Sequence, residues 1–372
     1  MDKNLLQPKA ELGLVVNICE TAKGGIATYL RLLHATTSGV ARHHFILPEA
    51  QRAELAPAME ATTFTDPGRG LGRLWRLFRT TLNTVRTRQP TILFFHSTFT
   101  LPVMLALRLL RVPGSYVYCP HGWAALRYPA DSWKRRIVAQ AEGFMCGYSD
   151  AVVNISSFDQ SYARAAGYGG DLRLIENAVP ENEGVPQKAP FSRDEPDIHI
   201  LFIGRFDRQK GLDILLESFR QVRLHRADLQ LHIVGASVLG DGQHSAQGEA
   251  AKGITFHGWL SPAGVQGFCE GADILVVPSR WEGFGLVVPE ALRAGTPVLV
   301  SDRGALPNLV IPGQTGFVGP LSVDDLTRAL KALDKQQLIS MRPACRASYE
   351  TRFHGDRFGQ EFIQLFKELT AR

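Results

Sequence analysis

The sequence predicts an α/β protein made of two domains, each built around a parallel β-sheet. Short apolar runs alternate with helical patterns in both halves of the chain, and this alternation is typical of parallel strands joined by helices. The segment 180–197 separates the two alternations, because it holds four prolines, many charges and little apolar material. The length of 372 residues also suits two domains better than one.

The first half of the chain begins with a short apolar run at 12–18, which predicts a buried strand. The pair Gly24-Gly25 follows this strand and precedes a helical pattern. Residues 71–88 form a second helical pattern in which arginines stand among regularly spaced apolar residues, as in a basic amphipathic helix. Further strands are expected at 44–47, 91–95, 115–119, 151–155 and 172–177, and a further helix from 134 onward.

Two features of the first half lie at the ends of expected strands, where parallel sheets hold their ligands. Gly25 follows the first strand, and His121 lies beside Gly122 after the strand at 115–119. The glycine pair is also compatible with a simple tight turn, and His121 with a structural loop. The phosphate-binding patterns GxGxxG and GxxxxGK[ST] do not occur at this turn, which gives little support to a dinucleotide or P-loop site.

The second half repeats the alternation of strands and helices. A strand at 199–203 leads into the loop 204–211, which carries Arg205 and Lys210 directly before a helix. Arginine can bind two phosphate oxygens at once and lysine adds a point charge, so this loop is a candidate diphosphate site. The alternative is an exposed basic turn. Further strands are expected at 229–234, 254–256, 274–277, 297–300 and 313–318, and helices at 212–223, 324–333 and 353–369.

The stretch 273–300 is the centre of this half and predicts a strand, a glycine-spaced loop, a helix and a further strand. The loop starts at Glu282, and the helix is expected to begin at Pro289 with Glu290 behind it. Glycines let a ligand approach the backbone, and a helix start attracts anions. Carboxylates beside an anion site suggest a ligand with many hydroxyls as well, such as a nucleotide sugar. The alternative is a solvated Glu282 and a helix-capping Glu290.

Composition and charge restrict the possible classes of protein. The most apolar candidate for a membrane span, 101–112, is short and contains Arg108 and Arg111. Residues 1–11 are polar and lack the apolar core of a signal peptide. Five scattered cysteines without a CxxC pair fit a reduced compartment and argue against a structural zinc site. We therefore expect a cytoplasmic protein.

The first half of the chain is basic. Residues 1–180 carry 20 lysines and arginines against 13 aspartates and glutamates, a net charge of +7. Such a surface suits an anionic membrane, a nucleic acid or no partner beyond solvent. Nucleic acid is the weakest of these, because aromatic residues for base stacking are not interleaved with the arginines.

Together these residues resemble the retaining glycosyltransferases of family 4, which have the GT-B architecture. The resemblance is carried by the segments 204–219, 278–301 and 304–318, with Glu282 and Glu290 as the Glu-x7-Glu element. In the first half it extends to the glycine pair, to Pro-His-Gly at 120–122 and to the turn at 175–180.

The resemblance implies two Rossmann-like domains that face each other across a cleft. We expect the first, on the acceptor side, at 1–180, a linker at 181–197 and the nucleotide-sugar-binding domain at 198–352. The final helix, at 353–372, is expected to pack back on the first domain.

The resemblance also implies roles for individual residues. Arg205 and Lys210 hold the diphosphate and stabilise the leaving group, and Glu282 contacts the transferred sugar. Glu290 binds the ribose hydroxyls, and His121 lies beside the donor sugar from the opposite domain. The base is expected near the turn at 257–260, and the remaining donor contacts are Gly25, Trp259, Gly283, Phe284, Gly285 and Leu286.

We therefore expect retaining transfer of a hexose from a UDP- or GDP-linked sugar to a hydroxyl acceptor, without a metal or other cofactor. A lipid-linked or polysaccharide-precursor glycan is the expected acceptor, with the protein peripheral on the inner membrane face. A sugar-nucleotide epimerase of the same fold is the alternative. Two departures from the family pattern, Gly235-Ala-Ser237 in place of Gly-Asp-Gly and Asn308 in place of Glu, affect the expected nucleotide region.

Overall fold

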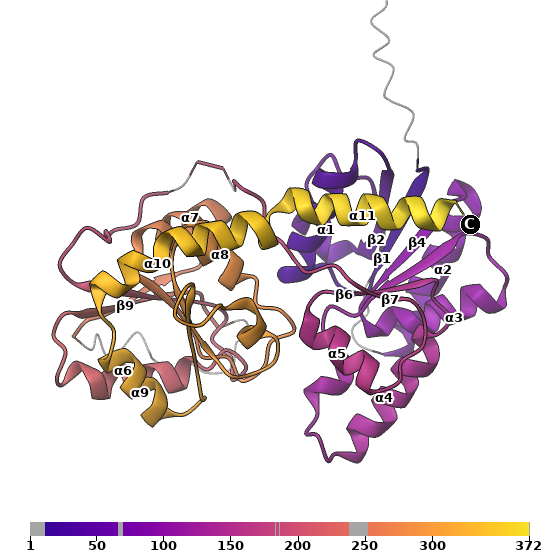
Figure 1. The fold of residues 1–372 in the computed structure, drawn as a ribbon. Coiled ribbons are helices and arrows are strands. Elements are labelled where there is room, and N and C mark those ends of the chain that lie inside the picture. The colour runs from indigo at the N-terminus through magenta and orange to yellow at the C-terminus, as the bar shows by residue number, and fades with distance from the viewer. Residues whose placement is uncertain (1–11, 66–69, 183, 186, 238–251, 372) are drawn as a thin grey trace, which may run out of the picture. The chain divides into compact units, whose positions relative to one another are not determined.

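The computed structural model describes residues 12–371 apart from 66–69, 183, 186 and 238–251. The chain forms two compact units (Figure 1). The first holds Met1–Ala178 together with Gly355–Arg372, and the second holds Val179–His354. Residues 1–11, on which the expectation of no signal peptide rests, lie outside the described residues.

The first unit is built on a seven-stranded sheet in the order β3-β2-β1-β4-β5-β6-β7, with all neighbouring strands parallel. Strands β2 and β3 extend to one side of β1 and strands β4 to β7 to the other. The carboxyl ends of β1 and β4 therefore flank a topological switch point. The strands are β1 Leu14–Cys19, β2 Arg42–Pro48, β3 Ala61–Phe64, β4 Ile92–His96, β5 Ser115–Cys119, β6 Ala151–Asn154 and β7 Leu172–Leu174.

Helices cover both faces of this sheet. Helices α2, α3 and α5 pack on one face, where side chains such as Leu77, Met104 and Ala163 join the core. Helix α11 packs beside α1 on the other face, where its Phe362 meets Phe94 of the sheet (Figure 1). The helices are α1 Gly25–Thr37, α2 Leu71–Arg88, α3 Leu101–Leu109, α4 Trp133–Cys146, α5 Ser157–Ala165 and α11 Gly355–Thr370.

The second unit has a six-stranded parallel sheet in the order β10-β9-β8-β11-β12-β13. The order again reverses between the first strand of the unit, β8, and its fourth, β11. The strands are β8 Ile198–Ile203, β9 Leu229–Val234, β10 Ile254–Gly258, β11 Ile274–Val277, β12 Val298–Ser301 and β13 Gly316–Gly319. Two parallel sheets with flanking helices confirm the α/β class expected from the sequence.

The helices of the second unit also lie on both faces of its sheet. Helices α6 and α9 pack together over a core that includes Phe202 and Phe219, and α8 packs with α7 and α10. Phe191, from the segment expected as a linker, is buried and stacks on His232 with ring centroids 3.7 Å apart. The helices are α6 Leu212–Arg223, α7 Pro262–Gly271, α8 Val287–Arg293, α9 Val323–Lys331 and α10 Lys335–Ser348.

The apolar stretch at 101–112 forms the short helix α3, whose Leu101, Val103, Met104 and Leu107 are buried in the first unit. Within the described parts of the chain, helices of sufficient length and apolar character to span a membrane are absent.

Candidate functional site

Two loops of the second unit leave the carboxyl edge of the sheet at its switch point. The loop at 204–211 follows β8, and the loop at 278–286 follows β11. Strands β8 and β11 are hydrogen-bonded neighbours, so the loops start side by side. This is the position at which open α/β sheets bind ligands.

An ion pair between Lys210 and Glu282 joins the two loops. The Lys210 Nζ donates to Glu282 Oε1 over 2.6 Å, and the Ser279 hydroxyl donates to the same oxygen over 3.0 Å. Only 8% of the Glu282 side chain and 18% of the Lys210 side chain are exposed. Solvent and salt screen such a pair weakly. The structure thus brings together two of the expected site residues, 72 positions apart in the sequence.

Arg205 lies on the same loop as Lys210 but is half exposed, with 48% of its side chain accessible. Its guanidinium lies 3.1 Å from the Asp207 carboxylate and donates to the Gln209 side-chain oxygen over 3.3 Å. Asp207 in turn accepts a hydrogen bond from the backbone N–H of Lys210. The loop therefore presents Lys210 as an enclosed cation and Arg205 as an exposed one, and Arg208 is exposed as well.

Close backbone contacts fix the spacing of the two loops. The Arg280 N–H donates to Gln209 O over 2.7 Å. Gly211 has a φ of +70°, and a Cβ at this position would lie 1.9 Å from Pro278 O, so a larger residue would push the loops apart. The Arg280 guanidinium donates two hydrogen bonds to Asp213, and these hold the pKa of the Asp213 carboxyl below its ordinary value.

The residues at 283–286 lead directly into helix α8. This helix begins at Val287, so the expectation of a start at Pro289 is wrong by two residues. Gly285 has a φ of +94°, which favours glycine, and it makes the turn into the helix. The ring of Phe284 is buried in the core. The groups that this stretch can offer a ligand are therefore the backbone amides of Gly283, Phe284, Gly285 and Leu286.

Glu290 and Trp259 occupy other parts of the second unit. Glu290 lies on α8 close to α7, where burial and then its carboxylate raise the pKa of the Cys269 thiol. Trp259 follows β10 with 57% of its surface exposed. Beside it, His257 is hydrogen-bonded through Nε2 to His232 Nδ1 over 3.1 Å.

His121 lies in the first unit, on the loop after β5, and has a φ of +54°. Its Nε2 is 3.0 Å from Nδ1 of His96, the last residue of β4. The ring of Tyr29 meets the His121 ring edge-on, with centroids 4.6 Å apart. Burial lowers the pKa of His121 to about 3, so this imidazole is neutral near pH 7.

Gly25 is the first residue of α1 and is exposed. Gly24 before it has a φ of +57°, which a residue with a side chain adopts only with strain. This turn follows β1 at the switch point of the first sheet. The backbone of Gly25 is therefore open to a ligand at the carboxyl edge.

Three residues that the sequence did not single out support these loops. Ser279 bonds to Glu282, and His96 bonds to His121. Glu142 is fully buried and accepts hydrogen bonds from the backbone N–H groups of Ala124 and Ala125, which fixes the turn after His121. A polar residue at the end of a buried strand, or within two residues of it, was the available signal for His96 and Ser279. Glu142, inside a helix, gave no such signal.

Candidate metal ligands do not gather at these loops. In residues 12–65, 70–182, 184–185, 187–237 and 252–371, groups of three or more histidines, cysteines, aspartates and glutamates arranged to hold a metal ion are absent.

Family comparisons agree with this arrangement. The model "Glycosyl transferase 4-like domain" matches residues 24–178, and the model "Glycosyl transferases group 1" matches residues 197–336. Sucrose-phosphate synthase from Thermosynechococcus elongatus superimposes with a TM-score of 0.82 at 20% identity, over 96% of this chain and 99% of that one. HepE from Anabaena, in complex with UDP and glucose, superimposes with a TM-score of 0.77 at 18% identity, over 96% and 100%.

Relatives with curated descriptions are similar at the level of sequence. An uncharacterized 41.2 kDa protein in the cps region of Klebsiella pneumoniae is 27% identical over 368 residues, 95% of this chain and 99% of its own length. The lipopolysaccharide 1,2-N-acetylglucosaminetransferase of Salmonella typhimurium is 34% identical over 160 residues, 37% of this chain and 41% of the relative. The phosphatidyl-myo-inositol mannosyltransferase of Mycobacterium leprae is 33% identical over 181 residues, 47% of each chain. The last two matches thus span less than half of those relatives.

Two parallel α/β units, each matched by a glycosyltransferase family model, define an enzyme of the GT-B class. The chain belongs to the GT4-type glycosyltransferases, as the resemblance in its sequence implied.

Proposed function

We propose that the enzyme transfers a hexose from a nucleoside diphosphate sugar to a hydroxyl acceptor with retention of the anomeric configuration. The observation that carries this proposal is the pairing of Lys210 with Glu282 at the switch point, beside the exposed Arg205. The site combines cations for a diphosphate with a carboxylate for sugar hydroxyls. The epimerase alternative is not favoured, because both matching family models describe glycosyltransferases.

The proposed mechanism assigns the leaving group to the two cations. When the bond between sugar and diphosphate breaks, negative charge grows on the diphosphate and positive charge on the sugar ring. Preorganised cations stabilise the negative charge without reorganisation at the moment of reaction. Lys210 is held in place by Glu282, and Arg205 supplies a forked donor for phosphate oxygens.

The remaining candidates bind and orient the donor in this proposal. Glu282 contacts the transferred sugar, Glu290 the ribose hydroxyls and His121 a hydroxyl of the sugar. Trp259 lies toward the base, and backbone amides at Gly25 and at 283–286 approach the diphosphate and sugar. The HepE structures contain UDP or UDP-glucose, so UDP-sugars are the first donors to test, before GDP-sugars.

The experiment is a panel of nucleotide sugars assayed with the wild type and the variants Lys210→Ala and Arg208→Ala. We expect Lys210→Ala to lower turnover on the order of 10²–10³-fold, the loss seen when one preorganised electrostatic group is removed. Arg208 is the matched control, because it is an exposed cation of the same loop. The anomeric configuration of the product, read by NMR, tests retention. Full activity in Lys210→Ala would contradict the proposed role.

We also propose a lipid-linked or polysaccharide-precursor glycan as the acceptor, reached at an anionic membrane surface. Helix α4 supports this proposal, because Trp133, Ile137 and Phe144 expose 66%, 56% and 62% of their surface beside the exposed Lys134 and Arg136. Exposed aromatic and basic side chains on one helix are typical of contact with a lipid interface. Two of the relatives are named for acceptors of this kind, lipopolysaccharide and phosphatidyl-myo-inositol.

A further inference from the structure

A continuous chain of hydrogen bonds runs through the first unit from His121 to the end of helix α1. His121 Nε2 lies 3.0 Å from His96 Nδ1, and His96 Nε2 lies 3.2 Å from Asn17 Oδ1. Asn17 Nδ2 lies 3.2 Å from His43 Nδ1, and His43 Nε2 lies 2.7 Å from Thr37 Oγ1. We call these five residues the histidine relay.

The histidine relay lies in the interior of the first unit, where polar groups need hydrogen-bond partners. Asn17, His96 and Thr37 are fully buried and His43 is 6% exposed. Phe94 packs against the His96 ring with centroids 4.2 Å apart, and α1 and α11 cover this face of the sheet. A buried polar group without a hydrogen bond is strongly destabilising, so a fully paired arrangement is preferred over a broken one.

The Thr37 hydroxyl determines which atoms donate and which accept along the whole histidine relay. Its hydroxyl carries one proton and lies 2.6 Å from the backbone oxygen of Leu33, which can only accept. The Thr37 proton therefore goes to Leu33 O. His43 must then donate from Nε2 to the Thr37 oxygen, which leaves His43 Nδ1 without a proton.

The remaining donors and acceptors of the histidine relay follow in the same way. Because His43 Nδ1 accepts, the Asn17 amide nitrogen donates to it, and Asn17 Oδ1 accepts from His96 Nε2–H. His96 Nδ1 is then an acceptor, so His121 must donate to it from Nε2. A neutral imidazole has one N–H, so Nδ1 of His121 carries a lone pair. Among the described residues, the side-chain hydrogen bond of His121 is the one through Nε2, and none involves Nδ1.

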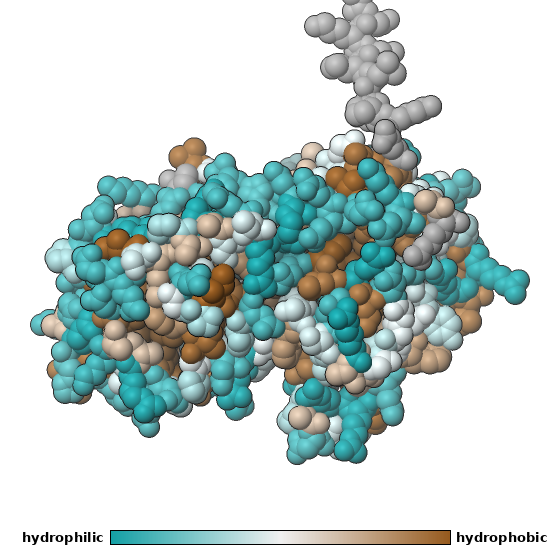
Figure 2. Space-filling model, viewed as in Figure 1, coloured by the Kyte–Doolittle hydropathy of each residue, from teal (hydrophilic) through white to brown (hydrophobic). Residues whose placement is uncertain are grey.

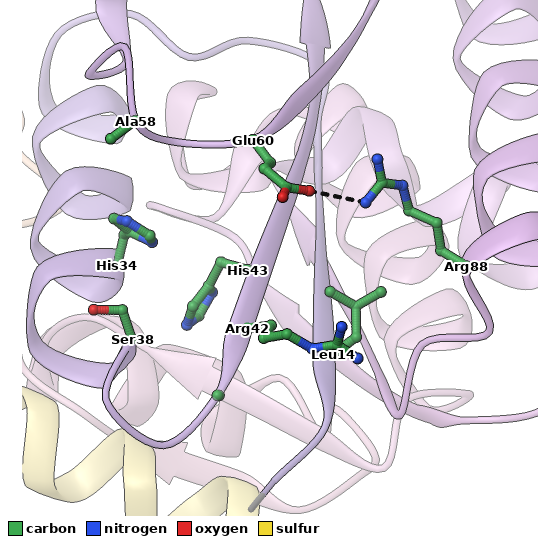
Figure 3. A pocket seen from close by; sticks show the side chains of 9 residues that line it. Leu14, His34, Ser38, Arg42, His43, Ala58, Glu60 and Arg88 are labelled. Carbon is green, nitrogen blue, oxygen red and sulfur yellow. Dashed lines mark hydrogen bonds and ion pairs between the residues drawn. The ribbon is translucent and has the colours of Figure 1, made fainter. Parts of the chain in front are cut away.

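The imidazole rings of His43, His96 and His121 are neutral, because their surroundings disfavour the charged form. Burial lowers the pKa of His43 and of His121 to about 3, and it lowers the pKa of His96 well below its ordinary value. His43 also lines a cavity of about 420 Å³ together with His34, Arg42 and the ion pair of Glu60 and Arg88 (Figure 3). Both ring nitrogens of His43 are already bonded within the histidine relay, and after burial the neighbouring His34 lowers its pKa further.

We propose that the histidine relay is a positioning device that holds His121 in the Nε2–H tautomer, so that Nδ1 accepts a hydrogen bond from a hydroxyl of the donor sugar. The hydroxyl contact rests on the proposed function, whereas the tautomer rests on the first unit alone. Thr37, His43, Asn17 and His96 are positioning residues, since they act on the substrate through His121. A sugar hydroxyl, which can donate, suits this acceptor.

The test is ¹⁵N NMR of histidine side chains in the full-length protein at pH 7, where two-bond couplings distinguish the two tautomers. Signals are assigned with single His→Gln variants. We expect the Nε2–H tautomer for His121 in the wild type and in Thr37→Ser, which keeps the hydroxyl. In Thr37→Val the anchor is lost, so we expect the Nδ1–H form of His121 to appear. An Nδ1–H tautomer in the wild type, or an unchanged spectrum in Thr37→Val, would overturn the proposal.

A second variant tests the proposal independently, in case Thr37→Val does not fold. Asn17→Asp accepts from both neighbours, so His43, which must also donate to Thr37, is expected to carry a proton on both nitrogens while His121 stays Nε2–H. If both rings respond together, the direction assigned to the relay is wrong. In the transfer assay, kcat/KM of Thr37→Val should fall roughly tenfold relative to Thr37→Ser, the effect of one misdirected hydrogen bond. The NMR result holds even if no donor is turned over, which separates a failure of this proposal from a failure of the proposed function.

Discussion

At the scale of single residues, the most unusual group of the first unit is the carboxyl of Asp159. It is fully buried in helix α5, and neither oxygen has a hydrogen-bond partner among the described residues. Burial, and then the charge of Glu142, raise its pKa from 3.8 to about 8. The backbone oxygen of Asp159 accepts from the indole of Trp123, so this acid lies next to the turn that carries His121.

The raised pKa of Asp159 predicts a stability that falls as pH rises. The folded state holds a proton on this carboxyl up to about pH 8, whereas the unfolded chain releases it near pH 3.8. The free energy of unfolding therefore decreases between about pH 4 and pH 8. Asp159→Asn removes this dependence, so we expect its melting temperature to exceed that of the wild type increasingly toward pH 8.

The exposed Asp131 provides the control for that measurement, and Asp131→Asn should follow the wild type at every pH. Melting curves recorded from pH 4.5 to pH 8.5 give the comparison. A constant difference between Asp159→Asn and the wild type over this range would contradict a buried, protonated carboxyl.

The candidate site residues could be predicted individually from the sequence, but the contacts between them could not. Arg205, Lys210 and Glu282 could be found because each follows a recognisable strand. Their mutual arrangement depends on the pairing of β8 with β11, which local patterns do not specify. The same holds for the histidine relay, whose members come from three strands, a helix and a loop.

At the scale of elements, helix α11 completes one face of the first sheet. Gly359 faces α1 so closely that an added Cβ would lie 2.5 Å from Thr36 Cβ. Phe358 and Phe362 on either side of it reach the ring of Tyr29, with centroids 5.2 and 6.0 Å away. The close approach of two helices at a glycine therefore supports the packing around Tyr29, which itself touches His121.

This contact predicts that Gly359→Ala destabilises the first unit. Alanine improves helix propensity by about 1 kcal/mol, but overpacking a tight contact costs about 1–3 kcal/mol, so a net loss of up to about 2 kcal/mol is expected. Gly39→Ala is the control, because a Cβ at Gly39 meets open space. Urea unfolding measures the free energy of unfolding of both variants relative to the wild type. A Gly359→Ala protein as stable as the control would show that α1 and α11 can separate without cost.

Elements with a strong periodic pattern were predicted well, and short or irregular ones were missed. Helix α2 spans Leu71–Arg88 as expected, since its apolar residues recur at helical spacing. Strand β3, with four residues at the sheet edge, gave too short a pattern. Helix α10 was missed because Pro343 interrupts its sequence, a residue that usually ends a helix.

At the scale of the whole molecule, charge is unevenly distributed along the chain. Residues 1–180 carry a net charge of +7, while the whole chain carries +5. On the face shown in Figure 2, apolar side chains are exposed among hydrophilic ones over both units. An anionic surface should therefore attract the protein through the first unit, with the apolar side chains of α4 adding to the binding.

We accordingly expect binding to vesicles with about 30% anionic lipid at low salt, and a loss of binding at high ionic strength because salt screens the attraction. Trp133→Ser should weaken binding several-fold, since burying an aromatic side chain at an interface contributes about 1.5–3 kcal/mol at most. Leu224→Ser is the control, because Leu224 is an exposed apolar residue of the second unit. Vesicle cosedimentation gives the readout, and equal binding by the two variants would argue against α4 as the contact.

The path of the chain through the two units has a consequence for biosynthesis. The polypeptide enters the first unit, builds the whole of the second and returns to the first only with its last helix, Gly355–Thr370. On the ribosome, the second unit can therefore close before the first is finished. Until this helix has been synthesised, the aromatic face beneath it stays open to chaperones, and a nonsense codon near position 354 would leave that face permanently exposed.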